Sequence, residues 1–331
     1  MPLNIGRREL IAALGGVLAA WPLAAWGQQP AMPVIGFLRN TSRDDSVHLL
    51  AAVHQGLKQS GFVAGKNVEV EYRFADNQLD RLPALAADLV GRQVALIIAS
   101  GNAPSLAAKA ATTTIPVLFS TGADPVEIGL VPNLGRPRGN VTGASFLTST
   151  TLVAKRLDLL HELMPKVPTV TYLWNSNNSI MEHELRELRT AANALGLQVL
   201  AMSVGSERDF AAVFARLAQE RAVTLLVGAD SLFFSSLDHL VALAAHHALP
   251  TMYYLREFTA AGGLMSYGAS IADAHRQTGI YAGGILKGAR PADLPIVLPT
   301  KFELVINLTT AKALNIDVPL SLMVRADEMI D

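Results

Sequence analysis

Short β-branched or apolar runs alternate with longer helical patterns from Pro33 onward, and this alternation constrains the fold more than any other feature of the sequence. When a strand, a helix and a second strand follow one another in this way, the helix returns the chain to the starting edge, so the two strands run parallel. The sequence therefore predicts an α/β protein built from βαβ units around parallel sheets.

The first half of the pattern predicts five strands with helices between them. The expected strands lie at residues 34–38, 67–73, 95–99, 116–119 and 141–145, and the expected helices at 48–60, 79–92, 104–112 and 125–133. Gly61 and Gly91 occupy positions where helix C-terminal caps are expected. Pro104 and Pro125 stand where the first turn of a helix tolerates proline.

The pattern then restarts and predicts a second set of five strands. The expected strands lie at residues 169–174, 198–204, 224–228, 250–254 and 264–267, and the expected helices at 151–164, 180–195, 207–220 and 236–247. At 331 residues the chain is about twice the usual domain size. Two lobes of similar Rossmann-like architecture are therefore predicted.

The end of the chain holds too few elements for a third domain. We expect a helix at 272–287, strands at 296–298 and 303–307, and a short helix at 309–314. If the lobes share these elements, the chain crosses a hinge several times. The predicted lobes are residues 33–146 plus 270–299, and residues 147–269 plus 300–331.

Residues 1–27 have the pattern of an export signal. Arg7 and Arg8 precede an apolar stretch that Pro22 interrupts and that falls short of the roughly 20 residues of a membrane-spanning helix. Ala25 and Gly27, on either side of Trp26, are small residues at the spacing that a signal peptidase reads. The arginine pair resembles a twin-arginine signal, although Gly6 stands where Ser or Thr is commoner. Cleavage near Gly27 would leave a soluble periplasmic protein, and an uncleaved anchor is the alternative.

The composition excludes several classes of partner and chemistry. The formal net charge is −1, and no run of Lys or Arg is long enough to neutralise a phosphate backbone, so we expect no nucleic-acid partner. The chain contains no cysteine, which excludes disulfides, thiolate metal sites and a lipid-modified cysteine. A small molecule is the expected ligand.

Polar residues follow most of the predicted strands. Ligands of open α/β sheets bind beyond the carboxyl ends of the strands, so these residues are the candidate ligand contacts. In the first lobe they are Asn40, Thr41, Ser100, Gly101, Asn102, Ser120, Thr121 and Asp124. In the second lobe they are Asn175, Asn178, Asp230, Ser231 and Tyr254, and the loop after Tyr254 continues with Arg256, Glu257 and Phe258.

Three of these positions suggest an α-amino acid as the ligand. Residues 100–104 lead into a helix whose free N–H groups could receive a carboxylate, although Asn102 could instead only cap that helix. Asp124 or Asp230 could accept hydrogen bonds from an ammonium group, and each could equally be a helix or loop cap. The residues leave these alternatives open.

Aromatic side chains in the second lobe could stack on a ligand side chain, or could simply belong to the core. They are Phe233, Phe234, Tyr253, Tyr254, Phe258 and Tyr267. Tyr254 differs from the others because it ends a predicted strand.

The sequence contains no complete catalytic or metal-binding motif of the kinds that were considered. The segment 61–66 has one residue too few between its glycines for a phosphate-binding loop, and it precedes a strand where such a loop precedes a helix. There is no nucleophile elbow, and His161 and His246 lack partners at metal-ligand spacing. We expect no catalytic residues, metal or cofactor, although a pair assembled from distant loops stays open.

Several segments together resemble the substrate-binding proteins of ABC transporters, of the tryptophan/tyrosine-binding type. They are residues 34–38, 56–57, 61–62, 65–68, 120–126, 139–143 and 325–327. The similarity spans residues 33–331, and its most specific parts are Asp124-Pro125-Val126 and Asn140-Val141-Thr142-Gly143.

The resemblance implies a type I periplasmic-binding fold, with two Rossmann-like lobes that close on a ligand after three hinge crossings. It also implies that Asp124 and the loop 100–102 line the cleft, and that aromatic amino acids are candidate ligands. Many relatives are lipid-anchored, and the absence of cysteine is a departure from them.

The predicted function is therefore the solute-binding component of an ABC importer, a monomer that presents an amino acid or similar carboxylate to separately encoded permease subunits in the inner membrane. Ligand contacts from both lobes would favour the closed form. A receptor that serves a membrane sensor and an exported enzyme of the same fold class are the alternatives.

Overall fold

The computed structural model describes residues 32–146, 152–220 and 222–331. The predicted export signal, residues 1–27, lies outside the described residues. Residues from Pro33 to Asp331 form one unit. Within the described ranges, no helix combines the length and the apolar character needed to cross a membrane.

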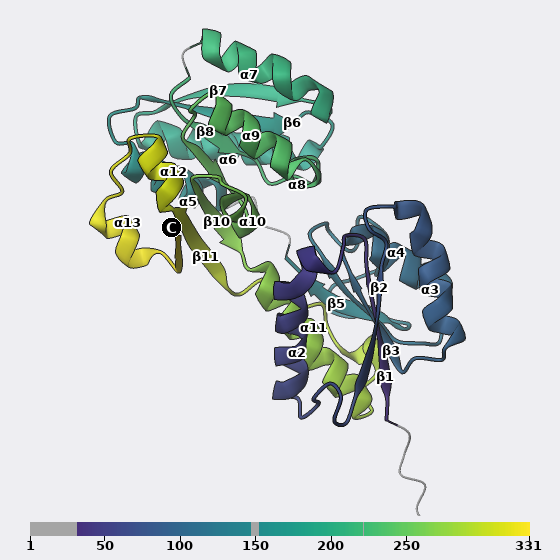
Figure 1. The fold of residues 1–331 in the computed structure, drawn as a ribbon. Coiled ribbons are helices and arrows are strands. Elements are labelled where there is room, and N and C mark those ends of the chain that lie inside the picture. The colour runs from purple at the N-terminus through teal and green to yellow at the C-terminus, as the bar shows by residue number, and fades with distance from the viewer. Residues whose placement is uncertain (1–31, 147–151, 221) are drawn as a thin grey trace, which may run out of the picture. The chain divides into compact units, whose positions relative to one another are not determined.

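The first half of the chain forms a parallel five-stranded sheet in the order β2-β1-β3-β4-β5 (Figure 1). Its strands are β1 (Val34–Arg39), β2 (Glu69–Phe74), β3 (Leu96–Ser100), β4 (Val117–Thr121) and β5 (Val141–Ser145). Strands β3, β4 and β5 are buried along their whole length. Helices on both faces explain this burial, because a parallel sheet covered on both sides exposes no face to water.

The side chains of this sheet alternate between two apolar clusters. One face packs against α3 (Leu82–Gly91) and α4 (Asn102–Ala111), as Ile97 and Phe119 do. The other face packs against α2 (Val47–Gln59) and α11 (Ile271–Leu286), as Phe37 and Ile98 do. Helix α11 therefore belongs to the core of a sheet whose last strand ends more than a hundred residues earlier.

Glycines allow α11 to lie directly against α2. A Cβ atom on Gly56 would stand 1.9 Å from the carbonyl oxygen of Arg276, and one on Gly279 would stand 2.2 Å from that of Val53. A Cβ atom on Gly283 would stand 2.2 Å from the Cβ of Ser60. Only residues without a side chain permit backbones to approach this closely.

The rest of the chain forms a seven-stranded sheet in the order β12-β11-β10-β9-β8-β6-β7. Its strands are β6 (Thr169–Asn175), β7 (Gln198–Val204), β8 (Leu225–Val227), β9 (Thr251–Tyr253), β10 (Met265–Ala269), β11 (Phe302–Asn307) and β12 (Glu328–Ile330). All pairs are parallel except β10 with β11. The two sheets confirm the predicted α/β class.

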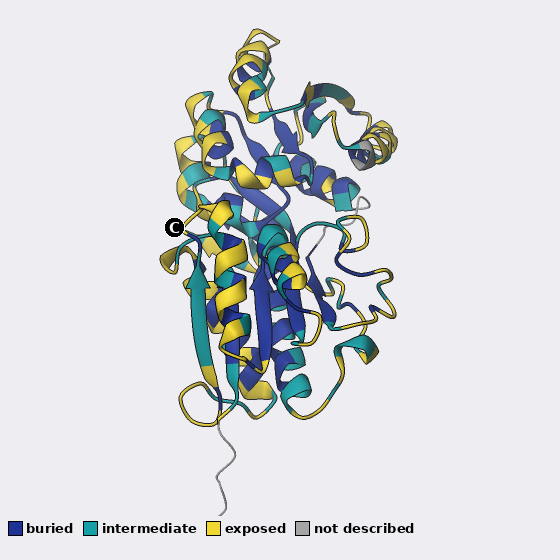
Figure 2. Ribbon diagram, turned by 90° about the vertical axis from the view of Figure 1, so that its right-hand side faces the viewer, coloured by how far each residue is buried: buried dark blue, intermediate teal, exposed yellow. Residues whose placement is uncertain are grey.

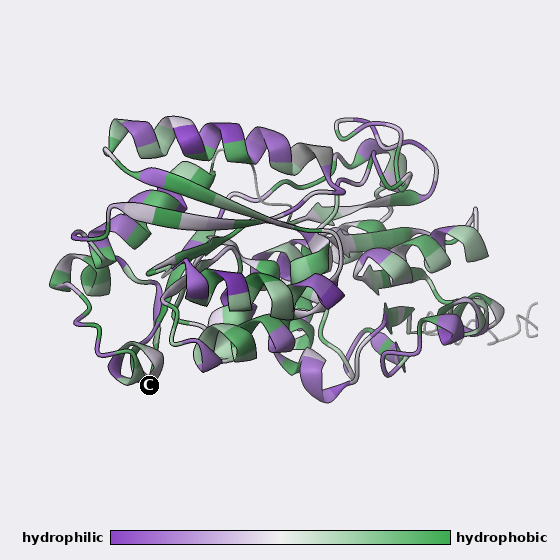
Figure 3. Cartoon of the chain, turned by 90° about the horizontal axis from the view of Figure 1, so that it is seen from above, coloured by the Kyte–Doolittle hydropathy of each residue, from purple (hydrophilic) through white to green (hydrophobic). Residues whose placement is uncertain are grey.

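Eight α-helices of the described ranges accompany the second sheet. They are α5 (Leu152–Leu163), α6 (Ser179–Ala194), α7 (Phe210–Gln219), α8 (Ser231–Ser235), α9 (Leu237–His246), α10 (Arg256–Ala260), α12 (Leu308–Ala313) and α13 (Leu320–Arg325). Four 3₁₀ turns complete the described elements: η1 (Asp44–Ser46), η2 (Leu79–Arg81), η3 (Glu207–Asp209) and η4 (Pro291–Asp293). The central strands are buried, the edge strands β2, β7 and β12 are mostly half-buried, and the outer helix faces are exposed (Figure 2). The helices likewise have apolar and polar sides (Figure 3).

Three expectations of the sequence were wrong. Residues 125–133 form turns instead of a helix, because Gly129 adopts a positive φ of 74° and Pro132 and Gly135 follow it. Residues 296–298 make a single bridge, Val297 to Ala144, instead of a strand. Gly91 lies inside α3, and Gln93 takes the left-handed conformation beyond it.

Four short elements, α8, α10, α13 and β12, were not expected from the sequence. Each spans six residues or fewer, so its hydrophobic pattern covers at most two turns or a few alternations. Elements this short are stabilised mainly by tertiary packing, which sequence periodicity does not report.

The α2–α11 contact gives a direct stability test. We expect Gly56→Ala to lower the free energy of unfolding by about 1–3 kcal/mol or more, because the new methyl group must displace the backbone of Arg276. Urea denaturation measures this change. Gly91→Ala is the matched control, since nothing lies within 4 Å of a Cβ atom there, and equal unfolding midpoints for the two variants would contradict the prediction.

Candidate functional site

Polar side chains meet at the carboxyl ends of β1, β3 and β4. Arg39, Ser100 and Ser120 are paired across these neighbouring strands. The Arg39 Nη1 group donates to Ser100 Oγ at 2.6 Å, and Arg39 Nε donates to Thr41 Oγ1 at 2.8 Å. The sheet register therefore brings together residues that are 61 positions apart in the chain.

His275 of α11 lies within hydrogen-bond distance of two members of this group, Ser100 and Ser120. Its Nδ1 lies 2.8 Å from the carbonyl oxygen of Ile271, which can only accept, so Nδ1 carries the proton and Nε2 accepts from Ser100 Oγ at 2.7 Å. Ser120 Oγ lies 3.3 Å from Nδ1. Burial lowers the pKa of His275 to about 3, so the ring is neutral. The side chains of Ser100 and Ser120, predicted ligand contacts, lie fully buried in this network.

The start of α4 matches only part of the prediction for residues 100–102. Asn102 is the first helical residue and Gly101 is the N-cap, so Asn102 does not cap the helix. The Thr121 hydroxyl donates to the side-chain oxygen of Asn102. Gly101 has a φ of 107°, and a Cβ atom there would stand 3.1 Å from Asn40 Oδ1. The structure thus brings Asn40, Gly101, Asn102 and Thr121 together at one edge.

Asp124 begins a turn instead of a helix. Its Oδ1 accepts from the backbone N–H groups of Val126 at 2.7 Å and Glu127 at 3.2 Å. The side chain therefore stabilises its own loop, in the way that aspartates commonly do in turns.

Asp230 is the centre of the predicted residues in the second sheet. Its Oδ1 accepts from Asn175 Nδ2 at 3.0 Å and from the backbone N–H of Leu232 at 2.8 Å, and its Oδ2 accepts from Asn178 Nδ2 at 2.6 Å. The hydroxyl of the buried Tyr254 donates to its carbonyl oxygen at 2.6 Å. Asp230 is therefore the N-cap of α8, and Ser231, the first residue of α8, is exposed.

A buried ion pair supports the segment that leads to Asp230. Arg156 Nη2 and Glu184 Oε1 lie 2.9 Å apart, and the two side chains are 0% and 2% exposed. Arg156 also donates to the carbonyl oxygen of Val227, and Glu184 accepts from the backbone N–H of Ala229, both at 3.4 Å. The pair thus holds the end of β8 from α5 and α6.

Two further charged residues at these edges were not selected from the sequence as ligand contacts. Arg39 ends β1, and Glu257 lies in α10 after β9. Glu257 Oε2 is buried and has no hydrogen-bond partner among the described residues. Burial, with a smaller contribution from the Glu303 charge, raises the pKa of Glu257 to about 7 against a hydrogen bond from its own backbone and the opposing charges of Arg256 and Arg39. For Arg39 the available signal was a charged residue at the end of an apolar strand, and for Glu257 it was a place in the polar loop after Tyr254.

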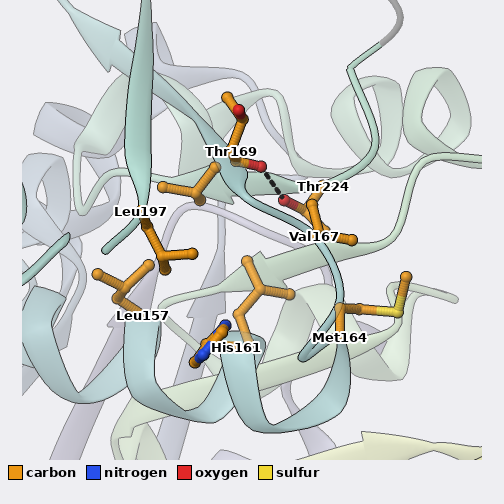
Figure 4. Close-up of a pocket in the computed structure, with 9 residues that line it drawn as sticks. Leu157, His161, Met164, Val167, Thr169, Leu197 and Thr224 are labelled. Carbon is orange, nitrogen blue, oxygen red and sulfur yellow. Dashed lines mark hydrogen bonds between the residues drawn. The ribbon is translucent and has the colours of Figure 1, made fainter. Parts of the chain in front are cut away.

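Two cavities lie away from these edges. One, shown in Figure 4, lies beside the amino ends of β6 and β8, where the Thr224 hydroxyl donates to the carbonyl oxygen of Thr169. Its volume of about 10 Å³ holds at most one water molecule. The other, of about 230 Å³, lies between α9, α12 and the start of β9.

In the described residues no three acidic or histidine side chains are grouped to hold a metal ion.

Two mainly parallel sheets with polar residues at their carboxyl ends have the type I periplasmic-binding fold, as predicted. A sequence model described as ABC transporter substrate binding protein matches residues 32–330. The chain therefore belongs to the family of ABC transporter substrate-binding proteins.

Known proteins agree with this assignment. The chain is 26% identical over 261 residues to a tyrosine-binding protein of Clostridioides difficile, covering 79% of this chain and 74% of the relative. It superimposes with a TM-score of 0.73, at 24% identity, on an ABC domain from Streptococcus pneumonia in complex with L-Trp. A ligand-free, open structure of a substrate-binding protein with adhesive properties from Clostridium difficile gives 0.71 and 24%. Both superpositions cover 90% of this chain and 99% of the other.

The buried ion pair predicts a large stability effect. Glu184→Gln should lower the free energy of unfolding by about 3–5 kcal/mol, because the charge of Arg156 stays buried without its partner. Glu187→Gln on the exposed side of the same helix is the control and should cost under about 1 kcal/mol. Urea denaturation of both variants tests the difference, and similar costs would show that the pair is not structurally important.

Glu257 predicts a pH-dependent stability effect. Because its pKa is raised from 4.5 to about 7 in the folded protein, protonation favours folding below about pH 4.5, and this stabilisation is lost as the pH rises through 7. Glu257→Gln should therefore gain stability over the parent, on the order of 1–3 kcal/mol at pH 8, and the gain should shrink toward pH 4.5. Melting temperatures across this range test it. A gain that is constant with pH, or that Glu220→Gln reproduces, would refute it.

Proposed function

We propose that this protein is the solute-binding component of an ABC importer and binds an α-amino acid, aromatic or branched, between two lobes. Membership of the substrate-binding family carries this proposal. The choice of ligand class is supported by the name of the Clostridioides difficile relative and by the polar strand ends of both sheets. No part of the proposed mechanism requires catalysis.

The proposed lobes are residues 33–146 plus 270–299, and residues 147–269 plus 300–331. The two sheets support this division, and so does α11, which follows β10 of the second sheet but packs on α2 of the first. Chain segments that leave one sheet for the other are suitable hinges. Ligand contacts from both lobes would then favour a closed form.

The proposed ligand contacts are the predicted residues at the strand ends. In the first lobe the backbone N–H groups of Asn102 and Ala103, at the start of α4, have no acceptor among the described residues and suit a carboxylate. In the second lobe Asp230 and Tyr254 form one hydrogen-bonded group with Asn175 and Asn178. Asp124 and Asp230 remain the predicted candidates for an ammonium contact.

We also propose that residues 1–27 direct export and that the mature protein is a periplasmic monomer which meets permease subunits of the inner membrane. Substrate-binding proteins of this family typically act outside the cytoplasm, which supports the location. A receptor that serves a membrane sensor would share all of these features. Genes for a permease and an ATPase beside this one would favour transport.

A thermal-shift screen tests the ligand class. The protein, unfolded, dialysed and refolded to remove bound ligand, is heated with amino acids, aromatic acids, sugars and polyamines. A ligand present at about 100 times its Kd stabilises the native state by about 2.7 kcal/mol, which raises the melting temperature by about 5 °C for a protein of this size. We expect this shift with aromatic or branched amino acids. A shift with sugars or polyamines alone would overturn the ligand class.

A further inference from the structure

Arg39 is a largely buried cation without a carboxylate partner. Arg256, at the edge of the other sheet, contacts both carboxylate oxygens of Glu328 at 2.6 Å. Arg39, in contrast, makes no salt bridge with any described residue, and its hydrogen bonds go to the hydroxyl groups of Thr41 and Ser100. Glu257 and Asp45 offset the burial of this charge only from beyond salt-bridge distance, so an anion in direct contact with Arg39 would be favoured.

The position of the Arg39 guanidinium is fixed before any ligand arrives. Thr41 holds Nε and Ser100 holds Nη1, and Ser100 is fixed in turn by His275. The third nitrogen, Nη2, has no hydrogen-bond partner among the described residues. Burial lowers the pKa of Arg39 to about 10, which still leaves it charged at neutral pH. Because the side chain is already ordered, a carboxylate would gain its contact at little entropic cost.

Glu257 has the opposite charge and likewise makes no salt bridge with any described residue. No described residue donates a hydrogen bond to its Oε2, which is shielded from water. Its neighbour Arg256 is held by Glu328, and Glu303 adds a second negative charge beside it. The surroundings of Glu257 therefore favour a cation.

Arg39 and Glu257 come from the carboxyl edges of different sheets and lie close enough for each charge to influence the other. They do not form a salt bridge, since no such contact within 4 Å exists between them in the described structure. A molecule that carries both an anion and a cation could satisfy the two residues together.

The carboxylates of Asp230 and Asp124 are already engaged. Asp230 accepts from Asn175, Asn178 and the backbone of Leu232, and Asp124 accepts from two backbone groups of its own turn. A ligand ammonium would gain less from either of these carboxylates than from Glu257.

We propose that Arg39 binds the carboxylate and Glu257 the ammonium of a zwitterionic α-amino acid, so that this pair selects zwitterions over simple acids and simple amines. This inference rests on the proposed function, because it names the residues that recognise the proposed ligand. With one N–H of Nε and one of Nη1 engaged, the second N–H of Nη1 and those of Nη2 could form a bidentate contact with a carboxylate, which a lysine ammonium does not offer.

Isothermal titration of three probes tests the assignment: L-tyrosine, tyramine, which lacks the carboxylate, and 3-(4-hydroxyphenyl)propanoate, which lacks the ammonium. Arg39→Gln should weaken binding of L-tyrosine at least about 30-fold and leave tyramine within about twofold of the parent. Glu257→Gln should weaken L-tyrosine to a similar extent and leave the propanoate within about twofold. Arg290→Gln, which removes an exposed ion pair with Asp293 in the segment after α11, is the control.

The outcomes separate this inference from the function on which it rests. If the parent binds no amino acid, both fail. If the parent binds L-tyrosine and both variants bind it equally well, only the inference fails. Equal losses for all three probes also overturn it, because they indicate that Arg39 and Glu257 pair with each other on closure. If Asp124→Asn or Asp230→Asn weakens the binding of L-tyrosine and Glu257→Gln does not, the ammonium contact belongs to Asp124 or Asp230 and the inference fails.

Melting temperatures of the unliganded variants exclude unfolding as the cause of lost binding. If Arg39→Gln does not fold, Arg39→Lys retains the charge and should weaken L-tyrosine about tenfold through loss of the bidentate contact. Unchanged affinity in Arg39→Lys and in Glu257→Gln would then contradict the assignment.

Discussion

The contact between α2 and α11 is the interaction on which the rest of the structure depends. Without Gly56 and Gly279 the two backbones could not approach, and α11 could not cover one face of the first sheet. Because α11 follows β10 of the second sheet, the same contact fixes where the chain leaves one sheet and joins the other. It also places His275 within hydrogen-bond distance of Ser100 and Ser120. The segment that joins the two sheets is therefore connected to the strand ends that form the candidate site.

Buried polar groups organise both edges, but in different ways. In the first sheet a hydrogen-bonded series runs from Arg39 through Ser100 and His275 to the backbone of α11. In the second sheet Arg156 and Glu184 hold the end of β8, and Asp230 joins the loops after β6 and β8. Buried networks of this kind order their loops when every member is satisfied. Arg156 Nε and Glu257 Oε2 are among the buried atoms that have no hydrogen-bond partner in the described residues.

The candidate site was partly predictable. Polar residues after strands identified the correct edge of each sheet, since the carboxyl ends of parallel strands lie together whatever the details of packing. The roles of individual residues were not predictable. Ser100 and Ser120 were selected because they are polar and follow predicted strands, yet both are fully buried, Ser100 between Arg39 and His275 and Ser120 beside His275. Arg39 was overlooked because a single charged residue at the end of an apolar strand resembles an ordinary exposed end.

The sequence by itself determined the α/β class, the succession of strands and helices in both sheets, and the family, because periodicity and local motifs depend on neighbouring residues. It did not determine the turns at residues 125–133 or the short elements α8, α10, α13 and β12, whose conformation depends on packing partners. Only the tertiary structure decided which charged side chains form salt bridges and which have no salt-bridge partner. That distinction depends on distances between residues such as Arg256 and Glu328, which lie 72 positions apart in the chain. Local sequence patterns contain no information about such distances, and the fold supplies it.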